Sequence, residues 1–176
     1  AWTLELRGGD VECTPVFLGF LLVGREDAVL CGRESAFSPA VRSALAADGV
    51  ALRPYGDIYA VLAGLPAGTR VMADGATANS RITEALAHTE WLDRRSPAAA
   101  RKAAKSAGEQ AGFRAAHLQD GAALCRFLYE MKTHPEDFTE LSAGALLHGL
   151  RAARPEFLED SFGAIVAYGA HGAIVH

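Results

Sequence analysis

The chain has 176 residues, half of them hydrophobic and 22% charged, and its formal net charge at pH 7 is −4. This composition excludes an intrinsically disordered tail, a fibrous repeat and a strongly basic nucleic-acid-binding protein. The three cysteines are widely spaced and exclude a disulfide framework, and the longest apolar run, residues 16–23, is far below the roughly 20 residues that cross a bilayer. We therefore expect a soluble, cytoplasmic protein that binds neither nucleic acid nor membrane.

The first half of the chain alternates between strand-like and helix-like segments. Strands are predicted over residues 2–7, 17–25, 28–31, 50–53, 70–73 and 90–93. Helices are predicted over residues 39–48, 58–63 and 78–88, with Ser38 and Asp57 as caps of the first two. The polar residues 24–27 fit a hairpin between the second and third strands. The pattern predicts a mixed α/β domain over residues 1–95.

The second half, residues 96–176, is predicted to be mostly helical. Ser96-Pro97 gives another helix start, and helices are expected over residues 106–132 and 140–153. A Gly-punctuated, strand-like tail is expected over residues 162–176. The long helix carries a stripe at spacings of four and three, formed by Phe113, His117, Asp120, Leu124, Phe127 and Met131. Both chain ends run directly into strand-like patterns, so we expect a piece of a longer protein. In isolation it should expose apolar stripes and aggregate or rely on a partner.

Two histidines in the tail are the strongest candidates for a binding or catalytic role. His171 and His176 lie in a Gly-rich strand-like segment, where the backbone can approach a ligand closely. Five residues apart, they face opposite sides of a regular strand and cannot both bind one metal without a bulge. The pattern leaves open whether one of them is functional. The chain has no phosphate-binding loop, no dinucleotide-binding glycine motif, no HExxH and no GxSxG.

Two helical groups allow both a functional and a structural interpretation. His117 and Asp120 are three residues apart and can touch on one helix, as an oriented base or as a hydrogen bond at a helix seam. The seam is favoured, because no nucleophile or oxyanion donor accompanies them. The remaining histidines, His88, His134 and His148, are expected to be structural or exposed.

An acidic cluster and an Arg–Asp pair also allow both a functional and a structural interpretation. The acidic residues 156, 159 and 160 could bind a divalent cation, but a solvated loop is favoured. Arg7 and Asp10 flank two glycines, which indicate tight backbone approach. They could contact a ligand or pair across a turn, and the pairing is favoured.

Four segments, in order, resemble the Xaa-Pro aminopeptidase (aminopeptidase P) family. WTLELRGGDV at residues 2–11, with TPVF at 14–17, is similar to the family's W-L-x-N-x-R-G-x-D-V…P-V-F stretch. KAAK at 102–105 with GFRAAHLQDG at 112–121, TELSA at 139–143, and SF at 161–162 with YGAHGAIVH at 168–176 resemble three later family motifs. Each match alone is weak, but four collinear matches across the chain are specific.

The resemblance implies a fold and an incomplete catalytic domain. Residues 1–95 resemble a mixed-sheet, creatinase N-terminal-like domain without its first strand and helix. Residues 96–176 resemble the first, helix-rich part of a pita-bread α+β catalytic domain. The family is expected to form homodimers. Its metal ligands follow the point where this sequence stops, so no metal ligand maps onto the chain, and the segment alone is expected to be inactive.

The resemblance also implies a mechanism for the full-length parent. Two divalent metal ions, expected to be manganese, activate a bridging water that attacks the first peptide bond of an Xaa-Pro peptide. His176 matches a histidine that lines the family's substrate pocket and is predicted to be catalytic. His171 stands where the family usually has asparagine, and it and Arg7 are predicted to bind substrate.

Three other interpretations remain open at this point. The parent could be a prolidase, a creatinase-like hydrolase, or a non-catalytic relative that binds peptides or proteins on the same fold. The Arg7–Asp10 and Pro15–Phe17 matches favour aminopeptidase P.

Overall fold

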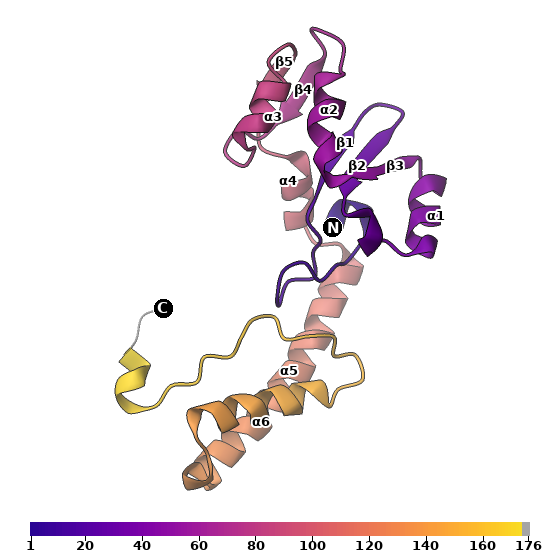
Figure 1. The fold of residues 1–176 in the computed structure, drawn as a ribbon. Coiled ribbons are helices and arrows are strands. Elements are labelled where there is room, and N and C mark those ends of the chain that lie inside the picture. Colours follow the sequence, from indigo (N-terminus) through magenta and orange to yellow (C-terminus); the bar gives the residue numbers. More distant parts are fainter. Residues whose placement is uncertain (174–176) are drawn as a thin grey trace. The chain divides into compact units, whose positions relative to one another are not determined.

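The computed structural model describes residues 1–173, and the predicted strand-like character of residues 174–176 lies outside them. The chain divides into two compact units, whose helices and strands are labelled in Figure 1. Unit 1 comprises Ala1–Asp10 and Pro15–Ala104, and unit 2 comprises Val11–Thr14 and the chain from Lys105 onward.

Unit 1 contains a mixed three-stranded sheet in the order β1-β2-β3, as expected for a mixed α/β domain. The strands are β1 (Gly19–Val23), β2 (Ala28–Gly32) and β3 (Val50–Pro54). β1 and β2 are antiparallel and form the predicted hairpin, closed by a hydrogen bond from the Gly24 N–H to the Asp27 carbonyl (2.8 Å). β3 runs parallel to β2.

The helices of unit 1 bury both faces of the central strand. Leu30 and Cys31 are adjacent on β2, so they point to opposite faces, and both are almost fully buried. Leu30 packs with Leu45 of α1 (Pro39–Ala47), and Cys31 packs with Ile58 of α2 (Ile58–Ala63). β2 is therefore the centre of the unit.

A second, two-stranded parallel sheet completes this part of the unit. It consists of β4 (Arg70–Ala73) and β5 (Glu90–Asp93), joined through α3 (Ser80–Ala85). Its Val71 joins the same apolar cluster as Cys31. A last short helix, α4 (Pro97–Ala103), follows β5.

Helix caps follow the sequence prediction in part. Ser38 accepts a hydrogen bond from the Val41 N–H at the start of α1. Gly49 follows the end of this helix and has a left-handed φ of +73°, which is typical of a helix C-terminus. Asp57 and Ser96 were expected to cap but make no side-chain cap bond. Asp57 adopts helical backbone angles, so its side chain is not oriented as a cap.

The described part of unit 2 contains helices and no strand. Its long helix α5 (Ala107–Thr133) starts with a capping box between Ser106 and Glu109. α6 (Glu140–Ala152) starts with a second box between Thr139 and Ser142, and the two helices pack on each other. The seam buries Ala123, Ala143 and Leu147.

The predicted stripe of α5 is only partly turned inward. Phe113 and Leu124 are exposed, and Ala123 is the residue of α5 that becomes buried. Large apolar side chains therefore remain exposed on this unit, among them Leu118, Leu128, Tyr129, Leu141 and Leu158. No helix in residues 1–173 combines the length and apolarity needed to cross a bilayer.

Two predicted strands are wrong. Residues 2–7 form a 3-10 helix at Trp2–Leu4 instead, because the Leu4 and Glu5 N–H groups bond back to Ala1 and Trp2. Residues 162–168 are irregular and Gly169–Ala173 is a 3-10 helix. A strand needs a partner, and the described part of unit 2 contains no strand to supply one.

Candidate functional site

The predicted substrate-binding residue His171 contacts the first residue of α6. Its Nδ1 lies 2.9 and 3.0 Å from the two carboxylate oxygens of Glu140. The Tyr168 N–H donates to the same carboxylate at 2.7 Å. These bonds, led by the Tyr168 N–H and followed by His171, hold the pKa of Glu140 below its usual range. The predicted catalytic residue, His176, lies outside the described residues.

The predicted substrate-binding residue Arg7 lines a pocket of about 300 Å³ within unit 1. The pairing expected between Arg7 and Asp10 is wrong, because Asp10 instead forms an ion pair with Arg33 and accepts the Leu18 N–H at 2.9 Å. The tight backbone approach is confirmed at Gly8, where a Cβ would lie 2.7 Å from the Phe17 Cβ. Arg7 itself is exposed at the pocket and does not take part in that pairing.

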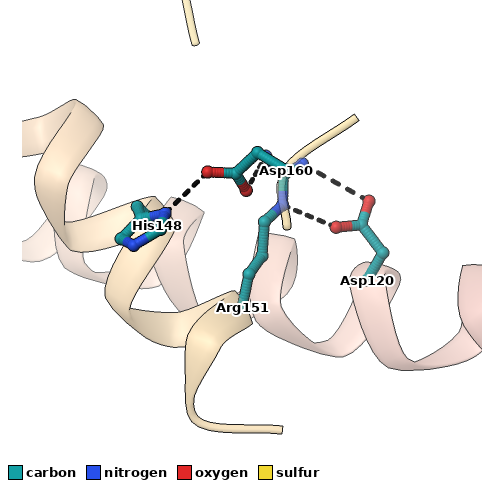
Figure 2. Close-up of polar contacts among 4 residues, drawn as sticks. All are labelled: Asp120, His148, Arg151 and Asp160. Carbon is teal, nitrogen blue, oxygen red and sulfur yellow. Dashed lines mark hydrogen bonds and ion pairs between the residues drawn. The ribbon is translucent and has the colours of Figure 1, made fainter. Parts of the chain in front are cut away.

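A network of four charged or polar side chains connects α5, α6 and the following loop (Figure 2). Arg151 donates from Nε to Asp120 Oδ1 at 2.7 Å, and its Nη1 lies 3.8 Å from Asp160 Oδ1. Asp160 Oδ2 lies 2.6 Å from Nδ1 of His148. Arg151 is shared between two carboxylates, and its own side chain is only 20% exposed.

This network corrects two sequence interpretations. His117 does not pair with Asp120, because its Nδ1 lies 2.8 Å from the Phe113 carbonyl one turn back, and Asp120 pairs with Arg151. Asp160 was expected in a solvated acidic loop, but its side chain is only 22% exposed and is held by His148 and Arg151.

The chemistry of the network is structural. Its members Asp120, Arg151 and Asp160 line a pocket of about 620 Å³ in unit 2, together with the apolar side chains of Phe113, Phe157 and Leu158. The network holds no hydroxyl or thiol nucleophile, and its single guanidinium is already engaged by carboxylates. Sequence reasoning missed Arg151 because its partners are 9 and 31 residues away, on other elements.

The two carboxylate–histidine pairs do not amount to a metal centre. Across residues 1–173, no three His, Cys, Asp or Glu side chains gather closely enough to hold an ion. The His171–Glu140 and His148–Asp160 pairs each supply two groups only. The described residues therefore do not fit a dinuclear metal site.

In chain order, the protein consists of a mixed α/β domain followed by a helical segment. Residues 1–109 match the family described as "Creatinase/Prolidase N-terminal domain", and the chain belongs to this family.

Similar proteins extend the match beyond that domain. The chain is 31% identical over 183 residues to "Xaa-Pro aminopeptidase 1" of Dictyostelium discoideum, covering all of this chain and 29% of that protein. It is 31% identical over 209 residues to "Aminopeptidase P2" of Arabidopsis thaliana, again covering all of this chain and 29% of the relative. The chain thus spans less than a third of the length of these curated relatives.

A solved structure with the same fold comes from an X-prolyl aminopeptidase. That protein is from Caenorhabditis elegans and is described as a cytosolic enzyme with a di-nuclear active site. The TM-score is 0.81 at 22% sequence identity, over 92% of this chain and 28% of that one. At this identity the likeness establishes the fold.

Proposed function

We propose that the chain is part of an Xaa-Pro aminopeptidase that releases the first residue of peptides with proline in second position. The observation that carries this proposal is the extent of the match. Curated Xaa-Pro aminopeptidases align with the whole chain, including α5, α6 and the tail beyond the N-terminal domain. A match confined to the N-terminal domain would have supported the fold alone.

The proposal assigns different roles to the two halves of the chain. Residues 1–95 form the creatinase N-terminal-like domain, and residues 96–176 begin a pita-bread catalytic domain. The exposed apolar side chains on α5 and α6 support an incomplete second domain. We propose further that the full-length protein is a cytoplasmic homodimer and that this segment alone is inactive.

Three residues of the chain are proposed to face the peptide. His176 is the catalytic residue, because an imidazole beside the scissile bond can donate a hydrogen bond to developing charge. His171 binds substrate, and its ring, with a side chain 66% exposed, is accessible to a ligand. Arg7 supplies a cation at the rim of the unit 1 pocket.

The metals of the proposed enzyme belong to the rest of the protein. Two divalent ions, proposed to be manganese, would supply a nucleophilic water there. The described residues bring no three metal-binding groups together, so no step through a metal is derived from this chain.

Hydrolysis of defined peptides by the full-length protein tests the proposal. We expect release of the first residue from an Xaa-Pro tripeptide in the presence of manganese, and its loss on chelation. Cleavage restricted to Xaa-Pro dipeptides would indicate a prolidase, and creatine hydrolysis without metal a creatinase-like enzyme. No hydrolysis of any of them would indicate a non-catalytic relative.

A further inference from the structure

The Glu140 carboxylate holds both ends of a tight turn. It accepts the Tyr168 N–H at 2.7 Å and the His171 Nδ1 at 2.9 and 3.0 Å. The turn is closed by a main-chain bond from the His171 N–H to the Tyr168 carbonyl at 3.2 Å, and Gly169 takes the left-handed φ of +59° that such a turn allows. One carboxylate thus fixes a turn that lies 28 to 31 residues further along the chain.

The same contact determines where the His171 ring carries its proton. An ionised carboxylate can only accept hydrogen bonds, so Nδ1 must be the protonated nitrogen. The lowered pKa of Glu140 is consistent with an ionised group at neutral pH. Within residues 1–173, Nε2 of His171 has no hydrogen-bond partner, and its side chain is 66% exposed. Nε2 is therefore the ring nitrogen that remains for a ligand.

We propose that Glu140 is a positioning residue that fixes the tautomer and the orientation of His171, so that Nε2 meets the backbone of the peptide substrate. A carboxylate that holds one ring nitrogen defines the role of the other. As a neutral ring, His171 accepts a hydrogen bond at Nε2 from a peptide N–H group. This assignment rests on the proposed Xaa-Pro aminopeptidase function.

A double-mutant cycle in the full-length protein tests the assignment. Glu140→Ala is expected to raise KM for an Xaa-Pro tripeptide about tenfold and to change kcat less than about twofold, because a binding contact is lost. His171→Ala should give a similar rise, and the double variant should be no worse than His171→Ala alone. Glu140→Gln keeps an acceptor and should recover most of the affinity. Glu136→Gln, an exposed glutamate of the same unit, is the matched control.

Either of two results would overturn the assignment. One is an unchanged KM in Glu140→Ala, and the other is a Glu140→Ala effect that persists in full in the His171→Ala background, which would indicate a purely structural role. If the alanine variant fails to fold, the proton position on the His171 ring of the wild-type protein still tests the assignment, since the absence of a proton at Nδ1 would overturn it.

The tautomer of His171 gives a readout that does not depend on activity. Nitrogen NMR of the ¹⁵N-histidine-labelled full-length protein should show His171 protonated at Nδ1 in the wild type, and that preference should be lost in Glu140→Ala. The same tautomer in both proteins would refute the pairing. If the wild type cleaves no Xaa-Pro peptide, the proposed function fails, while the NMR result still decides whether Glu140 controls His171.

Discussion

Asp120 on α5 and Arg151 on α6 are 31 residues apart in sequence and 2.7 Å apart in space. The same arginine faces Asp160 at 3.8 Å, so one cation joins both helices and the loop after them. Asp160 Oδ1 is buried and accepts no hydrogen bond, which leaves Arg151 as its neighbouring positive charge. Unit 2 therefore depends on Arg151 more than on Asp120, whose side chain is 48% exposed.

Removing Arg151 is expected to cost more stability than removing Asp120. Arg151→Met should lower the free energy of unfolding by about 2–3 kcal/mol, because it leaves a buried carboxylate oxygen without a cation. Asp120→Asn should cost at most about 1 kcal/mol, since its carboxylate is half-exposed and Arg151 keeps Asp160. Urea unfolding measures both, with the exposed Asp137→Asn as control. Equal losses for the two variants would contradict this account.

The contact between Glu140 and the turn at residues 168–171 should weaken in acid. A carboxyl whose pKa is lower in the folded than in the unfolded state stabilises the fold fully above its ordinary pKa. This contribution to stability is lost as the pH falls from the ordinary pKa of a glutamate through the lowered pKa of folded Glu140. Carbon NMR of the Glu140 carboxyl should give a lower midpoint in the folded chain than in urea. Identical midpoints in the two states would show that the carboxylate does not hold this turn.

The three thiols should differ in reactivity. Cys31 is fully buried and burial raises its pKa, while Cys125 is exposed on α5. Since the thiolate is the reactive form, iodoacetamide should modify Cys125 first and Cys31 only after unfolding. Burial and nearby carboxylates also raise the pKa of Cys13, so it should react more slowly than Cys125. Peptide mass spectrometry of a labelling time course measures the order. Early labelling of Cys31 would mean that β2 is not the centre of unit 1.

His176 should be required for turnover in the full-length protein. His176→Ala is expected to lower kcat by about a hundredfold or more, as is typical when a hydrogen-bond donor to developing charge is lost. Steady-state kinetics with an Xaa-Pro tripeptide measure this, and His134→Ala, at the end of α5, serves as the control histidine. Wild-type turnover in His176→Ala would remove the role proposed for this residue.

Local signals in the sequence were enough to predict most elements. Ser38, Ser106 and Thr139 each precede a helix and accept a main-chain N–H, and the polar residues 24–27 form the hairpin. Such caps and turns involve residues three or four apart, so their chemistry is visible in the sequence itself. The mixed α/β architecture followed from their order.

Two of the failures involve partners that are distant in the chain. Asp10 was expected to pair with Arg7 but pairs with Arg33, 23 residues away. Asp120 was expected near His117 but binds Arg151 on the next helix. At residues 2–7, alternating leucines indicated a strand, yet Leu4 and Leu6 reach the unit 1 core from a 3-10 helix and the residues after it. The spacing of residues along one helix or strand does not indicate which side chains of different elements contact each other.

The most direct test of the proposed function compares two tripeptides that differ only at the second position. The full-length protein with manganese is incubated with a peptide carrying proline there and with its alanine counterpart, and released first residue is quantified by mass spectrometry. We predict rapid release from the proline peptide and little from the alanine peptide. Equal release from both, or release from neither, would contradict assignment of this chain to an Xaa-Pro aminopeptidase.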